Sequence, residues 1–600
     1  MRGTDEIEKR RTAGVNDADA DQITWDLCSL YAGPDDVKLA RDMERCLAEA
    51  SSLNQIELGE CSPDELAAFL QQLERIEEFR AGFQDYACLY FATHTDEPSA
   101  DRLRQQAEET GGRIKSALLW FPVGWAALKK ERSNALSSHP KLAHYRRFLE
   151  RMTQWTGHRL SEPEERILNR KEIASRTSWV ALYEKVLSGM DVGETGRPYV
   201  SAQADLFSSR RDVRERSFSE ISQSADRLAY VFCHILNTVA LDTKITSDLR
   251  AFPSWAGQKH LENGIEDDLA TELIRQTVSG YHLVTRYYRL KARILDIPAL
   301  KVHDRFAPLP GLDRTYSWEE ARDLITTCWY DFSPGSAEFA VRFFHENRID
   351  AEPRKGKVTG AFSHPGPPAA HPFILCNFSG TVQDVLTLAH EFGHGLHQLL
   401  GRSQGIFYRE APLPLSETAA FFSEMLLLAH LQDGASTNRE RLGISCLRLE
   451  RIMATLFRQV ALFRFENHVH QAVGAQGGIG KKQLEAIWMK EQQSMYGDSL
   501  DFTGEYRYWW SLVPHFVHTP GYVYSYALAQ LVAIALFQQH SENNQDFVRK
   551  YERFLSSGGN FSLLELLELF EPDLRSSDVF KNSFTAIENF LQRAEDLAGG

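Results

Sequence analysis

Two histidines and a glutamate within five residues carry the most specific chemistry in this chain of 600 residues. His390 and His394 are four residues apart, so on a helix both imidazoles lie on one face and can bind one metal ion. Glu391 follows the first histidine and can hold a water molecule at that ion and accept its proton. The pattern is typical of zinc peptidases, in which zinc acidifies the water that attacks the peptide bond.

The residues around this motif predict a helix. Residues 381–390 have the apolar spacing of an amphipathic helix, and residues 395–400 continue it. Gly393 and Gly395 each cost about 1 kcal/mol in a helix relative to alanine, so we expect another backbone or a ligand to pass close to them. His397 lies on the same face as the two motif histidines, where we expect a structural role rather than ligation.

Zinc at a catalytic site needs a third protein ligand and one open position. The metzincin pattern would require a glycine at position 397 and a histidine at position 400, but the chain has His397 and Leu400 there. That class of zinc peptidase is therefore excluded. A glutamate on a second helix is the alternative source of the third ligand.

The chain after the motif offers two such glutamates. Residues 401–416 should form a loop, because Pro412 and Pro414 disfavour a helix, and an apolar helix carrying Glu417 and Glu424 should follow. A carboxylate in an apolar helix is costly unless it is paired or binds a metal. Glu417 is the better candidate ligand. Glu424, two turns later, either orients a ligand histidine through its free ring nitrogen or is an ordinary salt-bridged residue.

The chain resembles the oligoendopeptidase F branch of the thimet oligopeptidase superfamily from about residue 25 to about residue 590. The similar segments are residues 25–31, 348–362, 371–378, 388–400, 416–424 and 514–526. The resemblance implies one catalytic zinc ion held by His390, His394 and Glu417. It also implies that Glu391 is the catalytic base.

The resemblance further implies an edge strand beside the zinc site. An exposed strand edge can bind the main chain of an extended peptide, and we predict that Gly360, Ala361 and Phe362 do so. A glycine there would let the substrate backbone approach closely. An ordinary turn glycine is the alternative interpretation of Gly360.

Residues 514–526 resemble the histidine- and tyrosine-rich segment that faces the zinc in this family. The tetrahedral intermediate needs hydrogen-bond donors aimed at its oxyanion. We predict that His518 and Tyr522 lie near the reacting carbonyl, with Tyr526 behind them. Gly521 stands where many relatives would have a bulky aromatic residue, so the local shape should differ. The remaining candidates in this segment are His515 and Tyr524.

The composition argues against a nucleic-acid partner, a membrane span and secretion. The formal net charge of −15 argues against nucleic acid, whose phosphates repel an acidic surface. No run of eighteen apolar residues occurs, so no membrane span is expected. Residues 1–11 are charged and lack the apolar core of a signal peptide. The eight cysteines show no paired spacing and predict reduced thiols. Together these features predict a cytoplasmic protein.

Repeated helix-start signals predict a mainly α protein. Capping boxes begin at Ser62, Ser161, Ser317 and Ser562 and precede helical periodicity. Strand-like segments are few and lie mainly between residues 341 and 378. We expect an N-terminal helical region at residues 1–200 and a catalytic zinc metallopeptidase domain at residues 201–600. The resemblance implies that these two helical regions enclose a deep channel, with a small β-sheet beside the zinc site.

The sequence therefore predicts a zinc-dependent oligoendopeptidase that hydrolyses internal bonds of short unfolded peptides. A catalytically silent zinc-dependent peptide-binding protein is the alternative, although a pure binder would gain nothing from Glu391. A zinc hydrolase of non-peptide amides fits least, because a strand edge suits an extended peptide. The oligomeric state stays open at this stage.

Overall fold

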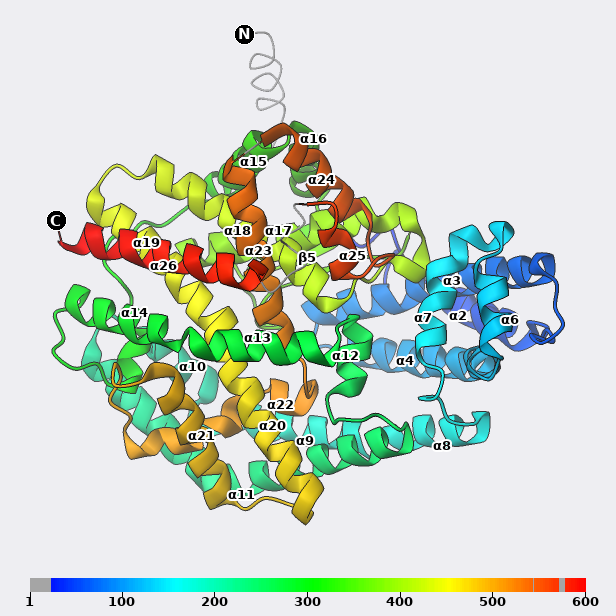
Figure 1. Cartoon of the computed structure of the whole chain (residues 1–600), viewed down its shortest axis with the longest axis horizontal. Helices are drawn as coiled ribbons and strands as arrows, with labels where there is room; N and C mark the ends of the chain where they lie inside the picture. Colours follow the sequence, from blue (N-terminus) through cyan, green and yellow to red (C-terminus); the bar gives the residue numbers. More distant parts are fainter. Residues whose placement is uncertain (1–22, 369, 543, 571–577, 600) are drawn as a thin grey trace, which may run out of the picture.

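The computed structural model describes residues 23–368, 370–542, 544–570 and 578–599, and it is built mainly from helices (Figure 1). The predicted signal-free N-terminal segment, residues 1–11, lies outside the described residues. The first helices form one end of the molecule, drawn in blue and cyan in Figure 1. They are α2 (Val37–Ser52), α3 (Pro63–Thr93), α4 (Pro98–Leu118), α5 (Trp120–Ala126), α6 (Lys130–Ser137) and α7 (Arg146–Gln154).

The rest of the chain forms the larger body. Its first half contains α8 (Glu162–Glu172), α9 (Arg176–Ser188), α10 (Tyr199–Asp205), α11 (Arg211–Leu249), α12 (Gly257–Asn263), α13 (Asp267–Ser279), α14 (Tyr281–Ile294), α15 (Trp318–Phe332) and α16 (Pro334–His345). Its second half contains α17 (Val382–Gly401), α18 (Leu413–Gly434), α19 (Asn438–Ile452), α20 (Arg458–Gln476), α21 (Lys481–Tyr496), α22 (His515–His518), α23 (Tyr524–Glu542), α24 (Asn544–Ser556), α25 (Leu563–Leu567) and α26 (Asp578–Gly599). A π-helical turn over Met453–Phe457 joins α19 to α20.

Four predicted helix starts are confirmed, at α3, α8, α15 and α25. At the first of these, the Ser62 hydroxyl accepts a hydrogen bond from the Glu65 N–H at 3.2 Å, and the Glu65 carboxylate accepts one from the Ser62 N–H at 2.7 Å. Two backbone donors that lack partners inside the helix are thereby satisfied. The same reciprocal bonds begin α15 and α25.

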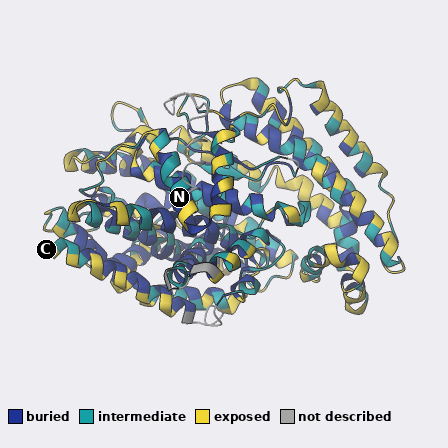
Figure 2. Ribbon diagram, turned by 90° about the horizontal axis from the view of Figure 1, so that it is seen from above, coloured by how far each residue is buried: buried dark blue, intermediate teal, exposed yellow. Residues whose placement is uncertain are grey.

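Two hydrophobic clusters hold the described residues together. One cluster is formed by buried residues from Trp25 to Met152, and the other begins at Tyr183 and extends to Ala594. Figure 2 shows buried residues inside both parts and exposed residues on the outer faces of the peripheral helices. The clusters separate between Met152 and Tyr183, and the domain boundary at residue 200 stays a prediction.

A three-stranded sheet lies where the two clusters meet. Its strands are β3 (Ile349–Asp350), β4 (Phe362–His364) and β5 (Phe373–Leu375), in the order β3-β5-β4. β5 pairs parallel with β3 and antiparallel with β4. Because side chains alternate along a strand, Phe373 and Leu375 join the first cluster while Ile374 joins the second. A separate hairpin pairs β1 (Asp191–Val192) with β2 (Arg197–Pro198).

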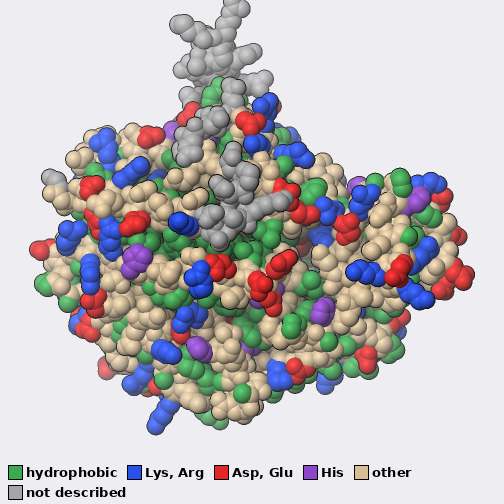
Figure 3. Space-filling model, viewed as in Figure 1, with side chains coloured by type: hydrophobic (Ala, Val, Ile, Leu, Met, Phe, Trp, Pro, Cys, Tyr) green, Lys and Arg blue, Asp and Glu red, His purple; other side chains and the backbone are tan. Residues whose placement is uncertain are grey.

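The surface carries charges of both signs. Acidic and basic side chains are interspersed over the face shown in Figure 3. All eight cysteines are free thiols, and five of them are buried. No helix in the described part of the chain is both long and apolar enough to cross a membrane.

Candidate metal centre

The motif helix α17 packs unusually closely against its neighbours at the two glycines. A Cβ on Gly393 would lie 2.7 Å from the Ala419 carbonyl oxygen of α18, closer than packed atoms tolerate. A Cβ on Gly395 would lie 3.0 Å from the Phe343 ring. The expectation that another backbone passes close by is confirmed at Gly393, whereas at Gly395 the neighbour is a side chain. These contacts bring α18 against the face of α17 that carries the motif.

The start of α18 differs from the prediction. Residues 401–416 do not form a loop throughout, because α18 begins at Leu413. Pro412 is the residue before the helix and Pro414 lies in its first turn, where no backbone N–H is needed for an intrahelical bond. A proline would break a helix in its middle, but it is tolerated at the start of α18. The earlier start places Glu417 within the second turn of α18.

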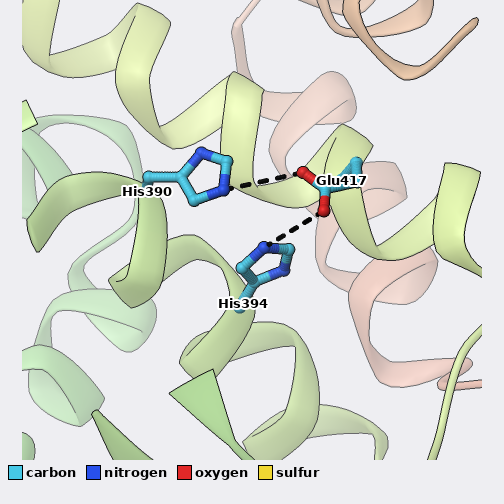
Figure 4. Close-up of side chains that lie close together, drawn as sticks. All are labelled: His390, His394 and Glu417. Carbon is cyan, nitrogen blue, oxygen red and sulfur yellow. Dashed lines mark ion pairs between the residues drawn. The ribbon is translucent and has the colours of Figure 1, made fainter. Parts of the chain in front are cut away.

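Three side chains from these two helices converge (Figure 4). The Nε2 atom of His390 lies 3.6 Å from Glu417 Oε2, and Nε2 of His394 lies 3.8 Å from Glu417 Oε1. One nitrogen or oxygen atom from each of the three residues lies within 4.8 Å of the other two. Ligands bound at zinc distances of 2.0–2.2 Å around a tetrahedron lie about 3.4 Å apart. The three atoms are therefore spaced to close around one ion.

Glu417 supplies a second, independent indication that an ion belongs here. Glu417 is only 5% exposed to solvent, and its Oε2 atom accepts no hydrogen bond. Burial raises the pKa of Glu417 to about 7. A buried carboxylate without a partner is costly, whereas a divalent cation between the three side chains would satisfy it. The donor set of two imidazoles and one carboxylate fits zinc.

The other ring nitrogen of each histidine is also bonded. Nδ1 of His390 lies 2.7 Å from Glu424 Oε1, and Nδ1 of His394 lies 3.0 Å from the Ser416 hydroxyl oxygen. These bonds fix the ring orientations and leave both Nε2 atoms directed at Glu417. Glu424 is buried and not a surface residue, and it combines both predicted interactions, since it bonds His390 and is also salt-bridged.

Glu424 is itself held by Arg451 of α19. The Nε atom of Arg451 donates to Glu424 Oε2 at 2.8 Å, and a second guanidinium nitrogen contacts Oε1. Burial alone would raise the pKa of Glu424, but the charge of Arg451 and the bond from His390 lower it to about 2. Glu424 is therefore an anion in the protein interior.

Neither Ser416 nor Arg451 was predicted from the sequence. Ser416 had a weak signal, because a hydroxyl directly before the candidate ligand Glu417 is well placed to reach the same site. Arg451 had no signal in the sequence, because it follows Glu424 by 27 residues and contacts it only through the packing of α18 and α19.

Glu391 lies beside the three converging side chains. It is buried, and burial together with the nearby carboxylate of Glu417 raises its pKa to about 7, against the opposing charge of His390. A carboxyl group with such a pKa exchanges its proton readily near neutral pH. His397, in contrast, is buried with its Nε2 atom unpaired and packs near Phe554, outside the group of three.

The tyrosine segment approaches the same point from α23. The hydroxyl of Tyr526 donates to the hydroxyl of Tyr522 at 3.3 Å. Burial and the charge of Glu417 raise the pKa of Tyr522 to about 12, and the same two causes raise that of Tyr526. A ring contact from Tyr526 to Phe421, and another from Phe421 to His390, join this pair to the motif. Both hydroxyls are therefore neutral, and because Tyr526 donates its proton to Tyr522, the proton of Tyr522 is the one left to donate.

The two histidines of this segment are placed apart. The ring of His515 lies 6.0 Å from Tyr522 and 6.2 Å from Tyr526. His518 instead contacts Tyr183, and its Nε2 atom lies 3.5 Å from a Glu184 carboxylate oxygen of α9. The Tyr524 hydroxyl is bonded to Asn263 at 3.0 Å. The structure thus groups Tyr522 and Tyr526 with the motif and places His518 toward α9.

The predicted strand edge lies at β4. Of the three predicted edge residues only Phe362 belongs to this strand, as its first residue, whereas Gly360 and Ala361 precede it. In the described part of the chain β4 has a partner strand on one side only, β5. Gly360 has a φ of +88° with open space where a Cβ would lie. The Ser363 hydroxyl donates to Gln398 of α17 at 2.8 Å, and the Gln398 amide donates back at 3.2 Å. This pair fixes the strand relative to the motif helix, one turn beyond His394.

Comparison with known proteins settles the family. The model of peptidase family M3 matches residues 206–586, and the model described as oligopeptidase F matches residues 125–191. The chain belongs to peptidase family M3. The predicted resemblance is confirmed, and the chain is a metalloendopeptidase.

Two relatives align with most of this chain. An oligoendopeptidase F homolog of Lactococcus lactis is 24% identical over 96% of this chain and 97% of its own length. Oligopeptidase PepF of Bacillus subtilis is 26% identical over 76% of this chain and 69% of its own.

Solved structures show the same fold. Oligoendopeptidase-F from Enterococcus faecium, 18% identical, covers 94% of this chain and 97% of its own with a TM-score of 0.69. PZ peptidase A with an inhibitor, 16% identical, covers 93% of this chain and 98% of its own with a TM-score of 0.74. The expected mainly helical channel fold with a small sheet is confirmed.

Proposed function

We propose that this M3 peptidase is a zinc-dependent oligoendopeptidase that hydrolyses internal bonds of short unfolded peptides. The observation that carries the proposal is the buried Glu417 carboxylate between His390 and His394, whose Oε2 atom accepts no hydrogen bond, with Glu391 beside them. His390, His394 and Glu417 would hold the ion. When bound, zinc supplies positive charge that makes water more acidic and polarises a peptide carbonyl.

The chain's own residues then divide the remaining work. Glu391 takes the proton of the attacking water and delivers it to the leaving amine. Tyr522 offers its hydroxyl proton to the oxyanion of the tetrahedral intermediate, and Tyr526 lies behind it and donates to the Tyr522 hydroxyl. His518 was predicted to share this role, but its contacts with α9 direct it away from Tyr522 and disfavour that role. Glu424 and Ser416 keep the imidazoles of the ligands oriented.

Peptide binding is assigned to the free edge of β4. Phe362 presents main-chain groups to which an extended peptide can add as a further strand. Gly360 and Ala361, directly before β4, complete the proposed contact, although the Gly360 carbonyl oxygen already accepts from the Asn377 amide at 2.9 Å. Only an unfolded chain can present such a strand, which favours short peptides as substrates. The free thiols of all eight cysteines support a reducing compartment, so we keep the cytoplasm as the proposed location.

The direct test is hydrolysis of a quenched fluorescent peptide of about ten residues. We expect cleavage at an internal bond, loss of cleavage after dialysis against a chelator, and recovery with stoichiometric zinc. Tight binding of the peptide by the zinc-loaded protein without any cleavage would instead support the catalytically silent peptide-binding protein.

A further inference from the structure

A cavity of about 400 Å³ opens beside the histidine- and tyrosine-rich segment rather than at the three metal-binding side chains. Its walls come from α8, α9, α11 and α12, and from residues just after α22, which lie near one another in the lower part of Figure 1. The residues that matter here are Arg176, Asp242, Trp255, Lys259, His518 and Pro520. Charged and aromatic side chains thus face one partly open cavity.

Arg176 is a half-buried cation of this cavity with no ion pair among the described residues, whereas Lys171, the other unpaired cation in the wall, is exposed. The Nη2 atom of Arg176 donates to the His518 carbonyl oxygen at 3.1 Å, which uses one of the five N–H donors of a guanidinium. In the part of the chain that the structure describes, no carboxylate oxygen lies within 4 Å of it. Arg250 and Lys259 line the same cavity but are already paired, with Glu165 at 2.7 Å and Glu262 at 2.5 Å.

Two carboxylates also line this cavity, and neither neutralises Arg176. Asp242 and Glu172 act on Arg176 through their charge without reaching it. Burial lowers the pKa of Arg176 despite these charges, because no bonded anion compensates for the lost water. A guanidinium still stays protonated under ordinary conditions. Arg176 is therefore a partly buried cation with most of its donors unused.

The cavity is continuous in sequence with the catalytic tyrosines. Thr519 and Pro520 form part of its wall, and the Tyr522 N–H donates to the Thr519 carbonyl at 3.1 Å. Consecutive Cα atoms are 3.8 Å apart, so Pro520 and Tyr522 lie within about 7 Å of each other. Tyr522 in turn bonds Tyr526 beside Glu417. The cavity wall at Thr519 and Pro520 therefore lies two to three residues from Tyr522, which is near enough for one extended peptide to contact both places.

We propose that Arg176 forms an anion subsite that binds a carboxylate of the peptide substrate at a distance from the cleaved bond. The planar guanidinium matches a carboxylate in a two-pronged bond, and the ring of Trp255 in the same wall offers an apolar surface to the neighbouring side chain. The carboxylate can be the C-terminus of the peptide or an acidic side chain. This inference rests on the proposed peptidase function. The subsite would make the enzyme prefer peptides that carry a carboxylate at a fixed distance from the cleaved bond.

The test compares three matched series of fluorescent peptides that differ by one group. One series ends in a free acid, one in a C-terminal amide, and one carries a glutamate or a glutamine at successive positions in an amidated peptide. Affinity is measured by fluorescence anisotropy with the Glu391→Gln protein, and KM and kcat with the wild type. We expect one carboxylate position to strengthen binding and lower KM by about ten- to a hundredfold, as a charge-assisted bond would.

Arg176→Gln should abolish this preference while leaving kcat for amidated peptides unchanged, and Arg176→Lys should keep part of it. Lys185→Gln is the control, because it removes one positive charge from an exposed position of the same helix. A preference that follows the terminal acid assigns the C-terminus, and one that follows glutamate assigns a side chain.

Equal affinity for all series, or a preference that survives Arg176→Gln, would overturn the subsite. An equal loss of kcat for every peptide in Arg176→Gln would also overturn it, since it would mean that Arg176 only positions the His518 backbone. Carboxylate-dependent binding without hydrolysis in the wild type would uphold the subsite while contradicting the peptidase proposal.

Discussion

Glu424 bridges His390 and Arg451: its Oε1 atom lies 2.7 Å from His390 Nδ1, and its Oε2 atom accepts from Arg451 Nε at 2.8 Å. A buried anion thus lies behind one proposed ligand, and a partly buried cation lies behind the anion. The arrangement fixes the tautomer of the neutral His390 ring, because Nδ1 then carries the proton toward Glu424 and Nε2 has its lone pair toward Glu417.

This relationship predicts graded effects on metal binding. Glu417→Ala should leave no measurable zinc at micromolar concentrations, whereas Glu424→Ala should weaken affinity about 10–100-fold. Glu424→Gln keeps an acceptor for His390 and should lose less. Competition with a chromogenic chelator measures all three, at a temperature where circular dichroism shows each variant folded. An empty site in Glu424→Ala together with a filled one in Glu417→Ala would reverse the two roles.

Oxyanion support is predicted to come from Tyr522. Tyr522→Phe removes one hydroxyl and little packing, so turnover should fall roughly 10²–10³-fold with little change in melting temperature. Tyr524→Phe is the matched control, because its hydroxyl bonds Asn263 away from the metal centre. Unchanged turnover in Tyr522→Phe would move the role to Tyr526 or to a histidine of the same segment.

The close approach of α17 and α18 predicts an asymmetry between two glycines. Gly393→Ala would place a Cβ 2.7 Å from the Ala419 carbonyl and should destabilise the protein by about 1–3 kcal/mol. Gly474→Ala on α20 has its nearest neighbour at 3.8 Å, the end of the Lys244 side chain, and should stabilise by up to about 1 kcal/mol. Urea unfolding measures both. Equal effects would mean that the helices do not pack as closely as described.

Substrate size is predicted to follow from the channel. A folded protein would have to unfold to reach the motif, which costs several kcal/mol, whereas a flexible peptide of about ten residues loses only its own ordering entropy. We expect cleavage of short peptides and none of folded proteins. Full-length casein is the sharper substrate, because it is unstructured but large. Its rapid internal cleavage, blocked by Glu391→Gln, would show that the site is open.

Local patterns predicted the motif helix, Glu417 and the orienting role considered for Glu424, because helical spacing alone fixes which side chains share a face. The predicted loop over residues 401–416 was wrong at its end. Pro412 and Pro414 occur at the start of α18, where their missing N–H groups matter little. Ser416 and Arg451 depend on how α17, α18 and α19 pack, which no spacing encodes. The same holds for His518, whose direction is set by the turn between α22 and α23.

The central claim is that Glu391 moves the proton at a zinc site built by His390, His394 and Glu417, and Glu391→Gln tests it most directly. The change keeps the size of the side chain and leaves the proposed ligands untouched. Zinc content by atomic absorption and turnover of a short quenched peptide are measured on the same preparation. The account predicts about one zinc ion per chain and a loss of several orders of magnitude in turnover. Turnover within tenfold of the wild type, with zinc still bound, would contradict it.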